Sequence, residues 1–192
     1  GYTGACDVSG DVTVALGESK TCTLTNNDQQ SYLIVDKTVV NNNGGSAVAN
    51  GFLLTVDGGA ALDGALVPVN PGAHTAGETN LPGYVAGTWG GDCDAAGVAN
   101  VALGQTKTCT ITNDDQQAYI TVVKNVINDN GGSAAANDFL LTLEGSAVTS
   151  GVAVPVNPGT YTAGETLLSG YTFEGYTGAC DVSGDVTVAL GE

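Results

Sequence analysis

The chain has 192 residues, with 20 acidic side chains against 4 lysines and no arginine, and its formal net charge is −16. Nucleic acids and anionic membranes bind through basic patches, so neither is expected as a partner. The sequence has one histidine and no phosphate loop, Ser-His-Asp set or paired-carboxylate cleft, and no cofactor is expected. It also has no apolar run long enough to span a membrane.

The chain repeats itself at two intervals. Gly175–Glu192 is identical to Gly1–Glu18, an offset of 174 residues (175 minus 1), and Cys6, Cys93 and Cys180 recur at half of that offset, 87 residues. Repetition at a fixed period indicates a tandem array of one structural unit. Because the sequence stops partway through a third unit, we expect it to come from a longer array.

Polar segments separate one unit from the next, at Asn27–Gln30 and at Asp114–Gln117. Linkers this short should hold neighbouring units end to end. We expect a missing last strand to be supplied by a continuing chain or by a neighbouring copy. The expected divisions are the C-terminal part of a preceding repeat at 1–30, a complete repeat at 31–117 and a second repeat without its last strand at 118–192.

Short runs of alternating apolar and polar residues, broken by Gly, Asn, Asp and Pro, predict strands rather than helices. Several short strands at this spacing predict an all-β protein made of tandem, Ig-like antiparallel β-sandwich domains. In the first complete unit the expected strands are, in chain order, 32–40, 52–56, 65–69, 73–79, 84–89, 98–103 and 107–112.

Five cysteines recur in pairs rather than in metal-binding patterns. Cys6 and Cys22 are 16 residues apart, as are Cys93 and Cys109, and the partner of Cys180 would lie beyond the chain end. Repeated pairs without a CxxC motif or nearby histidines favour disulfides over zinc ligands. Disulfides in turn indicate an oxidising, extracellular location, and no metal site is expected from these residues.

Three polar side chains recur on strand faces that are otherwise apolar. Lys37 shares its face with Val35 and Val39, while Glu78 and Asn113 occupy comparable positions on later strands. A lysine is almost never fully buried unless it is paired. Lys124 and Glu165 repeat the first two members in the next unit, and Asn26 repeats the third in the preceding one.

Two interpretations of this set are open. Burial disfavours charge on an amine and on a carboxylic acid, so a neutral lysine could attack a carboxamide that a protonated acid polarises, forming an amide and releasing ammonia. The alternative is a buried Lys–Glu ion pair beside a hydrogen-bonded asparagine, which would contribute little to stability. The sequence favours the amide over the ion pair.

Three segments carry a resemblance to a known family: DKTVVNNNGGSAVANGFLLTV, HTAGETNLPGYVAGTWGGDCD and TKTCTITNDD. They resemble the prealbumin-like, Cna B-type (SpaA-like) repeats of bacterial surface proteins and pilins, and the resemblance covers essentially the whole chain. It implies β-sandwich domains in which a lysine of the first strand and an asparagine of the last form an isopeptide bond assisted by an acid. Carried over, Lys37, Glu78 and Asn113 form one such site.

The same resemblance places Lys124 and Glu165 in a second site, whose asparagine would be the equivalent of Asn26 beyond the present end. Two features depart from the family pattern. The second unit has LLSGY where the first has NLPGY, and the disulfides are absent from the commonest pilin version. Cystine could therefore be the main covalent tie in this chain.

One loop weakly resembles an oxygen-ligand calcium loop. Asp129 and Asn130 lie in an Asn-Asp-Asn-Gly-Gly segment, but the first unit has no acid in the matching loop, so a plain hairpin loop is favoured.

The sequence therefore predicts a structural repeat of an extracellular fibre, stalk or pilus-like surface protein, whose partners are identical repeats in the same or neighbouring chains. The alternatives are an adhesin that grips a glycan or protein through its loops, and a filament subunit completed by strand donation. Beyond a single self-directed amide reaction, no enzymatic activity is expected, because active sites are seldom copied once per unit along a rod.

Overall fold

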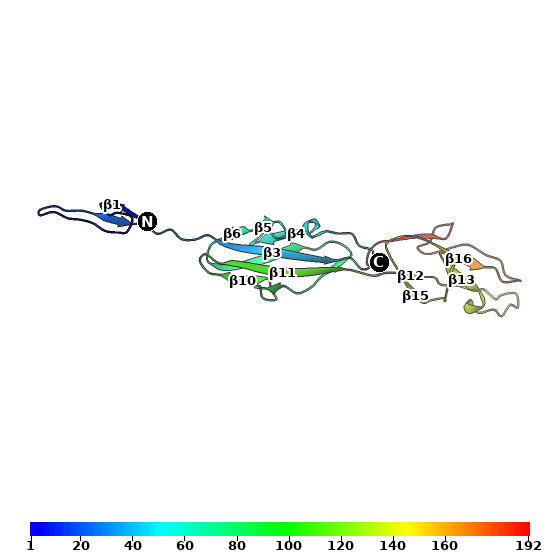
Figure 1. The fold of residues 1–192 in the computed structure, drawn as a ribbon. Helices are drawn as coiled ribbons and strands as arrows, with labels where there is room; N and C mark the ends of the chain where they lie inside the picture. Colours follow the sequence, from blue (N-terminus) through cyan, green and yellow to red (C-terminus); the bar gives the residue numbers. More distant parts are fainter.

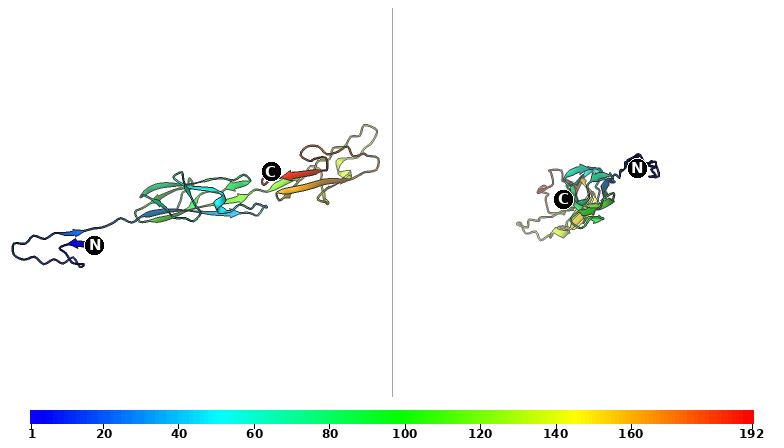
Figure 2. Two further views of the ribbon diagram at one scale, coloured as in Figure 1. Left: turned by 90° about the horizontal axis from the view of Figure 1, so that it is seen from above. Right: turned by 90° about the vertical axis from the view of Figure 1, so that its left-hand side faces the viewer.

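The computed structural model describes all residues from 1 to 192 and has an elongated shape. Three bodies follow one another along one line: an N-terminal hairpin, a first β-sandwich and a second one (Figure 1). The same arrangement is evident from above (Figure 2, left). The hairpin pairs β1 (Tyr2–Gly4) with β2 (Cys22–Leu24).

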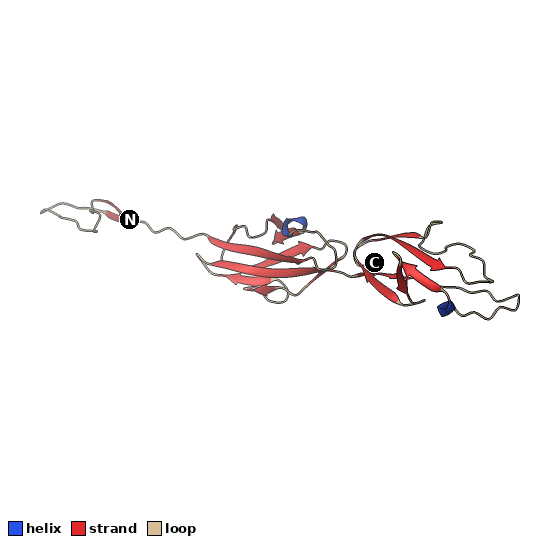
Figure 3. Cartoon of the chain, turned by 45° about the vertical axis from the view of Figure 1, so that its right-hand side comes forward, coloured by secondary structure: helices blue, strands red, loops and turns tan.

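The first sandwich consists of two sheets (Figure 3). One has the strand order β10-β7-β4-β5, and the other has the order β6-β3-β11-β8, with β9 also on β11. The core lies between the sheets and includes Leu33, Phe52, Leu54 and Val101. The strands are β3 (Ser31–Val40), β4 (Leu53–Val56), β5 (Gly59–Ala61), β6 (Val67–Val69), β7 (Gly72–Thr79), β8 (Tyr84–Ala86), β9 (Gly90–Gly91), β10 (Val98–Val101) and β11 (Thr106–Asp115).

One strand pair is parallel in this otherwise antiparallel fold. The first strand of the sandwich, β3, lies beside the last, β11, with a register that runs from Tyr32 opposite Thr106 to Val40 opposite Asp114. Antiparallel neighbours can be joined by a short hairpin, whereas a parallel pair needs a long connection. Here that connection is the rest of the sandwich, which places the first and last strands of the repeat side by side.

Most expected strands are present, and the differences have local causes. The expected strand at 84–89 is shorter, because only β8 at 84–86 is paired, and a separate two-residue strand, β9, follows at 90–91. A strand that was not expected, β5, pairs with β4 across a tight turn at Asp57-Gly58. Both turn residues have positive φ, 51° at Asp57 and 78° at Gly58, which is the geometry of a two-residue hairpin turn.

The second sandwich repeats the first with fewer paired strands. Its sheets have the orders β14-β13-β16-β17 and β12-β15. The strands are β12 (Ala118–Thr121), β13 (Leu140–Leu143), β14 (Ser146–Val148), β15 (Ala153–Val156), β16 (Gly159–Thr166) and β17 (Asp185–Val188). Single 3-10 turns at Ala49–Gly51 and Ala136–Asp138 are the only helical residues, and no helix has the length and apolar character that a membrane crossing requires.

The first strand of the second sandwich is much shorter than its counterpart. β12 ends at Thr121, whereas β3 continues to Val40. The far part of β3 pairs only with β11, and no residue from 1 to 192 takes the place of β11 beside residues 122–127. The alternation of exposed and half-buried side chains nevertheless continues through 122–127.

The two sandwiches meet at a packed junction. A Cβ atom on Gly44 would lie 2.7 Å from Pro158 Cδ, and one on Gly83 would lie 2.7 Å from Leu190 Cβ, so both glycines touch the second sandwich. Both also have positive φ, 89° and 78°, a conformation in which glycine carries no steric cost. Leu190 packs against the core of the first sandwich.

Candidate functional site

Lys37 and Glu78 meet inside the first sandwich. Lys37 lies on β3 and Glu78 on β7 of the facing sheet, and the Lys37 Nζ is 2.7 Å from Glu78 Oε2. Their side chains are 0% and 6% exposed. The ammonium group also lies 4.3 Å from the centre of the Phe52 ring, which adds a cation–π contact. The pair is therefore held in a closed, largely apolar space.

Asn113 lies on the strand next to Lys37. Lys37 is opposite Ile111 in the parallel register, and Asn113 is two residues further along β11, on the same face of the sheet. Its side chain is fully buried, and its Nδ2 donates a 2.8 Å hydrogen bond to Asn80 Oδ1. Asn80 in turn donates from Nδ2 to the Tyr84 carbonyl oxygen at 2.7 Å. Asn80 thus fixes the orientation of the Asn113 amide.

Four buried polar atoms at this site have no hydrogen-bond partner: Lys37 Nζ, Glu78 Oε1, Glu78 Oε2 and Asn113 Oδ1. The 2.7 Å approach of Nζ to Oε2 is an ion-pair distance, but its angles are not those of a hydrogen bond. Most buried side-chain polar atoms in folded proteins are paired, and leaving one unpaired costs about 1–3 kcal/mol. These are also the only four such atoms in the chain.

The second sandwich assembles two members of the corresponding set. Lys124 Nζ lies 2.6 Å from Glu165 Oε2 and 4.4 Å from the Phe139 ring centre, close to the values around Lys37. The third candidate, Asn26, is exposed and lies between β2 and β3, in the segment that joins the N-terminal hairpin to the first sandwich. This segment lies at the end of the first sandwich that is opposite to the second one (Figure 1). Leu167 stands at the position of Asn80. The structure therefore does not bring Asn26 to Lys124.

Both expected cystine pairs are present. Cys6 is bonded to Cys22 and Cys93 to Cys109, with Cα–Cα distances of 5.2 and 4.9 Å. Cys180 is a free, half-buried thiol whose pKa is raised by burial and by the negative charges of Asp181 and Asp185. A raised pKa keeps the thiol protonated and unreactive.

A buried carboxylate at the end of β11 was not anticipated from the sequence. Asp115 is 3% exposed and accepts hydrogen bonds from the backbone N–H groups of Asn42, Asn43 and Gly45, at 2.7–3.0 Å. Burial alone would raise the pKa of Asp115, but these N–H donors and the Asn43 side chain outweigh it and lower the pKa. The sequence carried one signal for this buried carboxylate. An aspartate recurs two residues after the candidate asparagine, as Asp115 after Asn113 and as Asp28 after Asn26.

The loop with Asp129 and Asn130, which the sequence suggested as a weak calcium site, is the counterpart in the second sandwich of the loop that binds the Asp115 carboxylate. In the second sandwich, Asn130 Nδ2 donates to Asp129 Oδ1 at 2.7 Å. Gly132 is so close to Tyr171 that a side chain would overlap the phenol oxygen. No three His, Cys, Asp or Glu side chains are placed so that they could hold a metal ion together, and the loop offers a cation only Asp129 and neutral oxygens.

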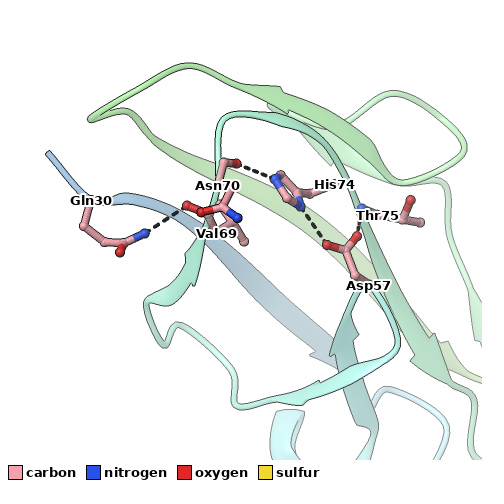
Figure 4. Close-up of polar contacts among 6 residues, drawn as sticks. All are labelled: Gln30, Asp57, Val69, Asn70, His74 and Thr75. Atoms are coloured by element: carbon pink, nitrogen blue, oxygen red, sulfur yellow. Dashed lines mark hydrogen bonds and ion pairs between the residues drawn. The ribbon is translucent and has the colours of Figure 1, made fainter. Parts of the chain in front are cut away.

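The single histidine holds a turn of the first sandwich, near the point at which Gln30 leads into β3 (Figure 4). The His74 Nδ1 is 2.6 Å from Asp57 Oδ2, and the His74 Nε2 is 2.6 Å from the Asn70 carbonyl oxygen. Both partners are acceptors, so both ring nitrogens must carry protons. The hydrogen bond to Asp57, followed by that to Asn70, raises the pKa of His74. Tyr161 stands at this position in the second sandwich and donates to the Asn157 carbonyl oxygen at 2.8 Å.

Comparison with known families gives one result. The prealbumin-like fold domain of the SpaA type matches the chain twice in tandem, at residues 28–111 and 115–192. No curated protein and no solved structure matches it. The family resemblance and the tandem all-β fold expected from the sequence are therefore confirmed.

Proposed function

The chain belongs to the family of SpaA-type prealbumin-like fold domains, and on that premise we propose that it is a load-bearing segment of an extracellular fibre, stalk or pilus-like surface protein. Repeats of this family are typical of bacterial surface proteins and typically have no catalytic role. The proposed repeat boundaries are those expected from the sequence, with one complete repeat at 31–117.

The observation that carries the proposal is the group of four unpaired polar atoms on Lys37, Glu78 and Asn113. An amide bond between Lys37 and Asn113 would replace the buried, charged amine of Lys37 with a neutral amide. In the proposed reaction, Lys37 Nζ attacks Asn113 Cγ and forms the new C–N bond. The Cγ–Nδ2 bond breaks, Glu78 passes a proton from Nζ to the departing nitrogen, and one ammonia is released.

The strand arrangement supports a mechanical role for that bond. The chain enters the repeat at the start of β3 and leaves it at the end of β11, and these two strands are parallel neighbours. A pull on the two ends therefore slides β3 along β11 and loads their hydrogen bonds together rather than one at a time. A Lys37–Asn113 bond would carry the load directly from one strand to the other.

The disulfides support an extracellular location. Cys93–Cys109 ties the segment before β10 to β11, and disulfides persist in oxidising compartments. Closing a loop of this length contributes about 3 kcal/mol in the chain-entropy model.

The loops favour a structural role over a glycan- or protein-binding one. Asn41 and Asn128 occupy the same position in the two sandwiches, and each donates to a backbone carbonyl and accepts from a tyrosine hydroxyl with closely similar distances. Binding loops in a tandem array would be free to differ between units.

Single-molecule force spectroscopy tests this proposal. With the Lys37–Asn113 bond, the segment between the two residues cannot extend, so the first repeat should give no full-length unfolding step. Under oxidising conditions the Lys37→Ala variant should give an unfolding step that is shortened only by the loop that Cys93–Cys109 closes. A step of that length in the unaltered protein would overturn the proposal.

A further inference from the structure

We propose that the second sandwich docks a leucine, Leu190, onto the core of the first, so that neighbouring repeats are held in one fixed orientation and the array is a stiff rod. The docking surface is the end of the first sandwich around Gly44 and Gly83, and its partner is the following repeat of the same array. The inference goes beyond a load-bearing role inside one sandwich, and it does not depend on a Lys37–Asn113 bond.

Leu190 belongs to the second sandwich by sequence but to the first by its contacts. It is half-buried and packs against the core of the first sandwich, and it is not among the side chains that pack against the core of the second. Its counterpart 87 residues earlier, Leu103, likewise does not pack against the core of its own sandwich and is 58% exposed. A leucine at this position of the repeat is therefore placed for contact with a neighbour.

The turn that carries Leu190 is a regular part of the repeat. Glu192 accepts a hydrogen bond through its side chain from the Ala189 N–H at 2.8 Å, and another through its carbonyl oxygen from the Tyr119 N–H at 2.9 Å. Gln105 of the first sandwich accepts the two equivalent bonds, both at 2.9 Å. The second sandwich therefore holds the leucine in a defined position relative to the start of β12.

Two glycines of the first sandwich make room for the second. A Cβ atom on Gly83 would lie 2.7 Å from Leu190 Cβ, and one on Gly44 would lie 2.7 Å from Pro158 Cδ and 2.9 Å from Asn157 Cβ. The backbone of the first sandwich is thus in direct contact with side chains of the second at two separate points. Closely packed contacts of this kind deform little, so they fix the angle between the two sandwiches.

The linker between the sandwiches has no free residue. β11 ends at Asp115, which is bonded to backbone N–H groups of the first sandwich. The Gln116 N–H donates to the Gly83 carbonyl oxygen at 2.8 Å, whereas Gln117 Nε2 donates to the Val156 carbonyl oxygen of the second sandwich at 2.6 Å. Both residues between β11 and β12 are therefore bound to a sandwich, and the linker does not behave as a flexible coil.

Each repeat carries both halves of the junction. The contact residues recur 87 positions apart, as Gly44 and Gly131, Gly83 and Gly170, Pro71 and Pro158, and Leu103 and Leu190. A contact between two different surfaces of the same unit is heterologous, and it can stack units head to tail in an open array. In such arrays each contact between neighbours adds its own contribution to stability.

Residual dipolar couplings of the backbone N–H groups in the 192-residue chain test the docking. We expect one alignment tensor to fit both sandwiches. Leu190→Ser should give the two sandwiches different tensors, while their amide chemical shifts show that both are still folded. Leu167→Ser, at an exposed leucine of the second sandwich, is the matched control and should keep one tensor. Different tensors in the unaltered chain, or one tensor in Leu190→Ser, would overturn the proposal.

A double-mutant cycle measures the same contact as a change in stability. Gly83→Ala places a methyl group where Leu190 lies and also puts an alanine at positive φ. In the Leu190→Gly background the space is vacant, so only the cost of the positive φ remains. The junction is lost in the first unfolding transition, whichever sandwich unfolds first, and circular dichroism during chemical unfolding follows that transition.

Gly83→Ala should raise the equilibrium constant of this first transition about tenfold more in the unaltered background than in Leu190→Gly. Equal effects in the two backgrounds would show that the contact between Gly83 and Leu190 is absent in solution, and would overturn the proposal.

Discussion

Asn113 lies two residues beyond the register partner of Lys37 on the neighbouring parallel strand, and both side chains are buried on the same face. A bond between them would join the first strand of the repeat to the last. The arrangement depends on the parallel pairing of β3 with β11, because no other pairing in the sandwich brings the entry and exit strands together.

Asn80 should control how fast the bond forms. It accepts a hydrogen bond from Asn113 Nδ2, and the second sandwich has Leu167 in its place. Asn80→Leu should slow the loss of ammonia about tenfold, the effect of one lost hydrogen bond. A time course of intact mass on freshly made protein measures it. Asn100→Leu, on the exposed face of β10, is the control, and equal rates for the two variants would contradict the role.

Asp115 should make stability depend on pH in acid. Its pKa in the folded protein lies below the ordinary value of 3.8, so the folded state holds its proton less tightly than the unfolded state. The contribution is present above about pH 3.8 and is lost as pH falls through the folded pKa. Urea unfolding from pH 7 down to pH 2 should show the loss.

Asp115→Asn should remove that part of the acid dependence. It should also cost about 1–3 kcal/mol at neutral pH, since an amide NH₂ then faces backbone N–H donors. Asp114→Asn, at the exposed neighbouring position, should change little. An acid dependence that is unaltered in Asp115→Asn would contradict the assignment.

His74 should make stability depend on pH in the opposite sense to Asp115. Its folded pKa is raised above the ordinary value of 6.5, so the contribution is complete below pH 6.5 and declines as pH rises through the folded value. His74→Tyr copies the second sandwich and should keep the bond to the Asn70 carbonyl without the pH dependence. Unfolding midpoints from pH 5 to 9 test this, and a variant that keeps the dependence would exclude His74 as its source.

Loss of the Cys93–Cys109 disulfide should lower the free energy of unfolding by about 3 kcal/mol. The measurement is chemical unfolding of the Cys93→Ala, Cys109→Ala double variant against the oxidised parent. Cys180→Ala, which removes a free thiol, should have a much smaller effect. A double variant as stable as the parent would show that the disulfide adds nothing to the packed core.

Much of this architecture could be predicted from the sequence, because alternation of apolar and polar residues determines which side chains a strand buries. Lys37 interrupts such a row, and its burial and its contact with Glu78 follow from the faces that these residues occupy. The cystine pairs followed from their recurrence. Strand ends were harder to place, since residues 122–127 lack strand geometry for want of a neighbouring strand rather than for any property of their own sequence.

The parallel pairing of β3 and β11, the role of Asn80 and the burial of Asp115 could not be predicted in this way. Each depends on contacts between residues far apart in the chain. Asp115 lies in a polar segment that suggests an exposed linker, and only the folded loop around Asn43 provides the N–H groups that make its burial favourable.

The intact mass of the oxidised, unaltered chain after full denaturation tests the central claim most directly. Our account predicts a mass below that of the disulfide-bonded sequence by one ammonia for the Lys37–Asn113 site, and no such deficit in Lys37→Ala or Asn113→Ala. Glu78→Gln should retain most or all of the ammonia. A mass equal to that of the disulfide-bonded sequence would contradict the account and leave Lys37 and Glu78 as a buried ion pair.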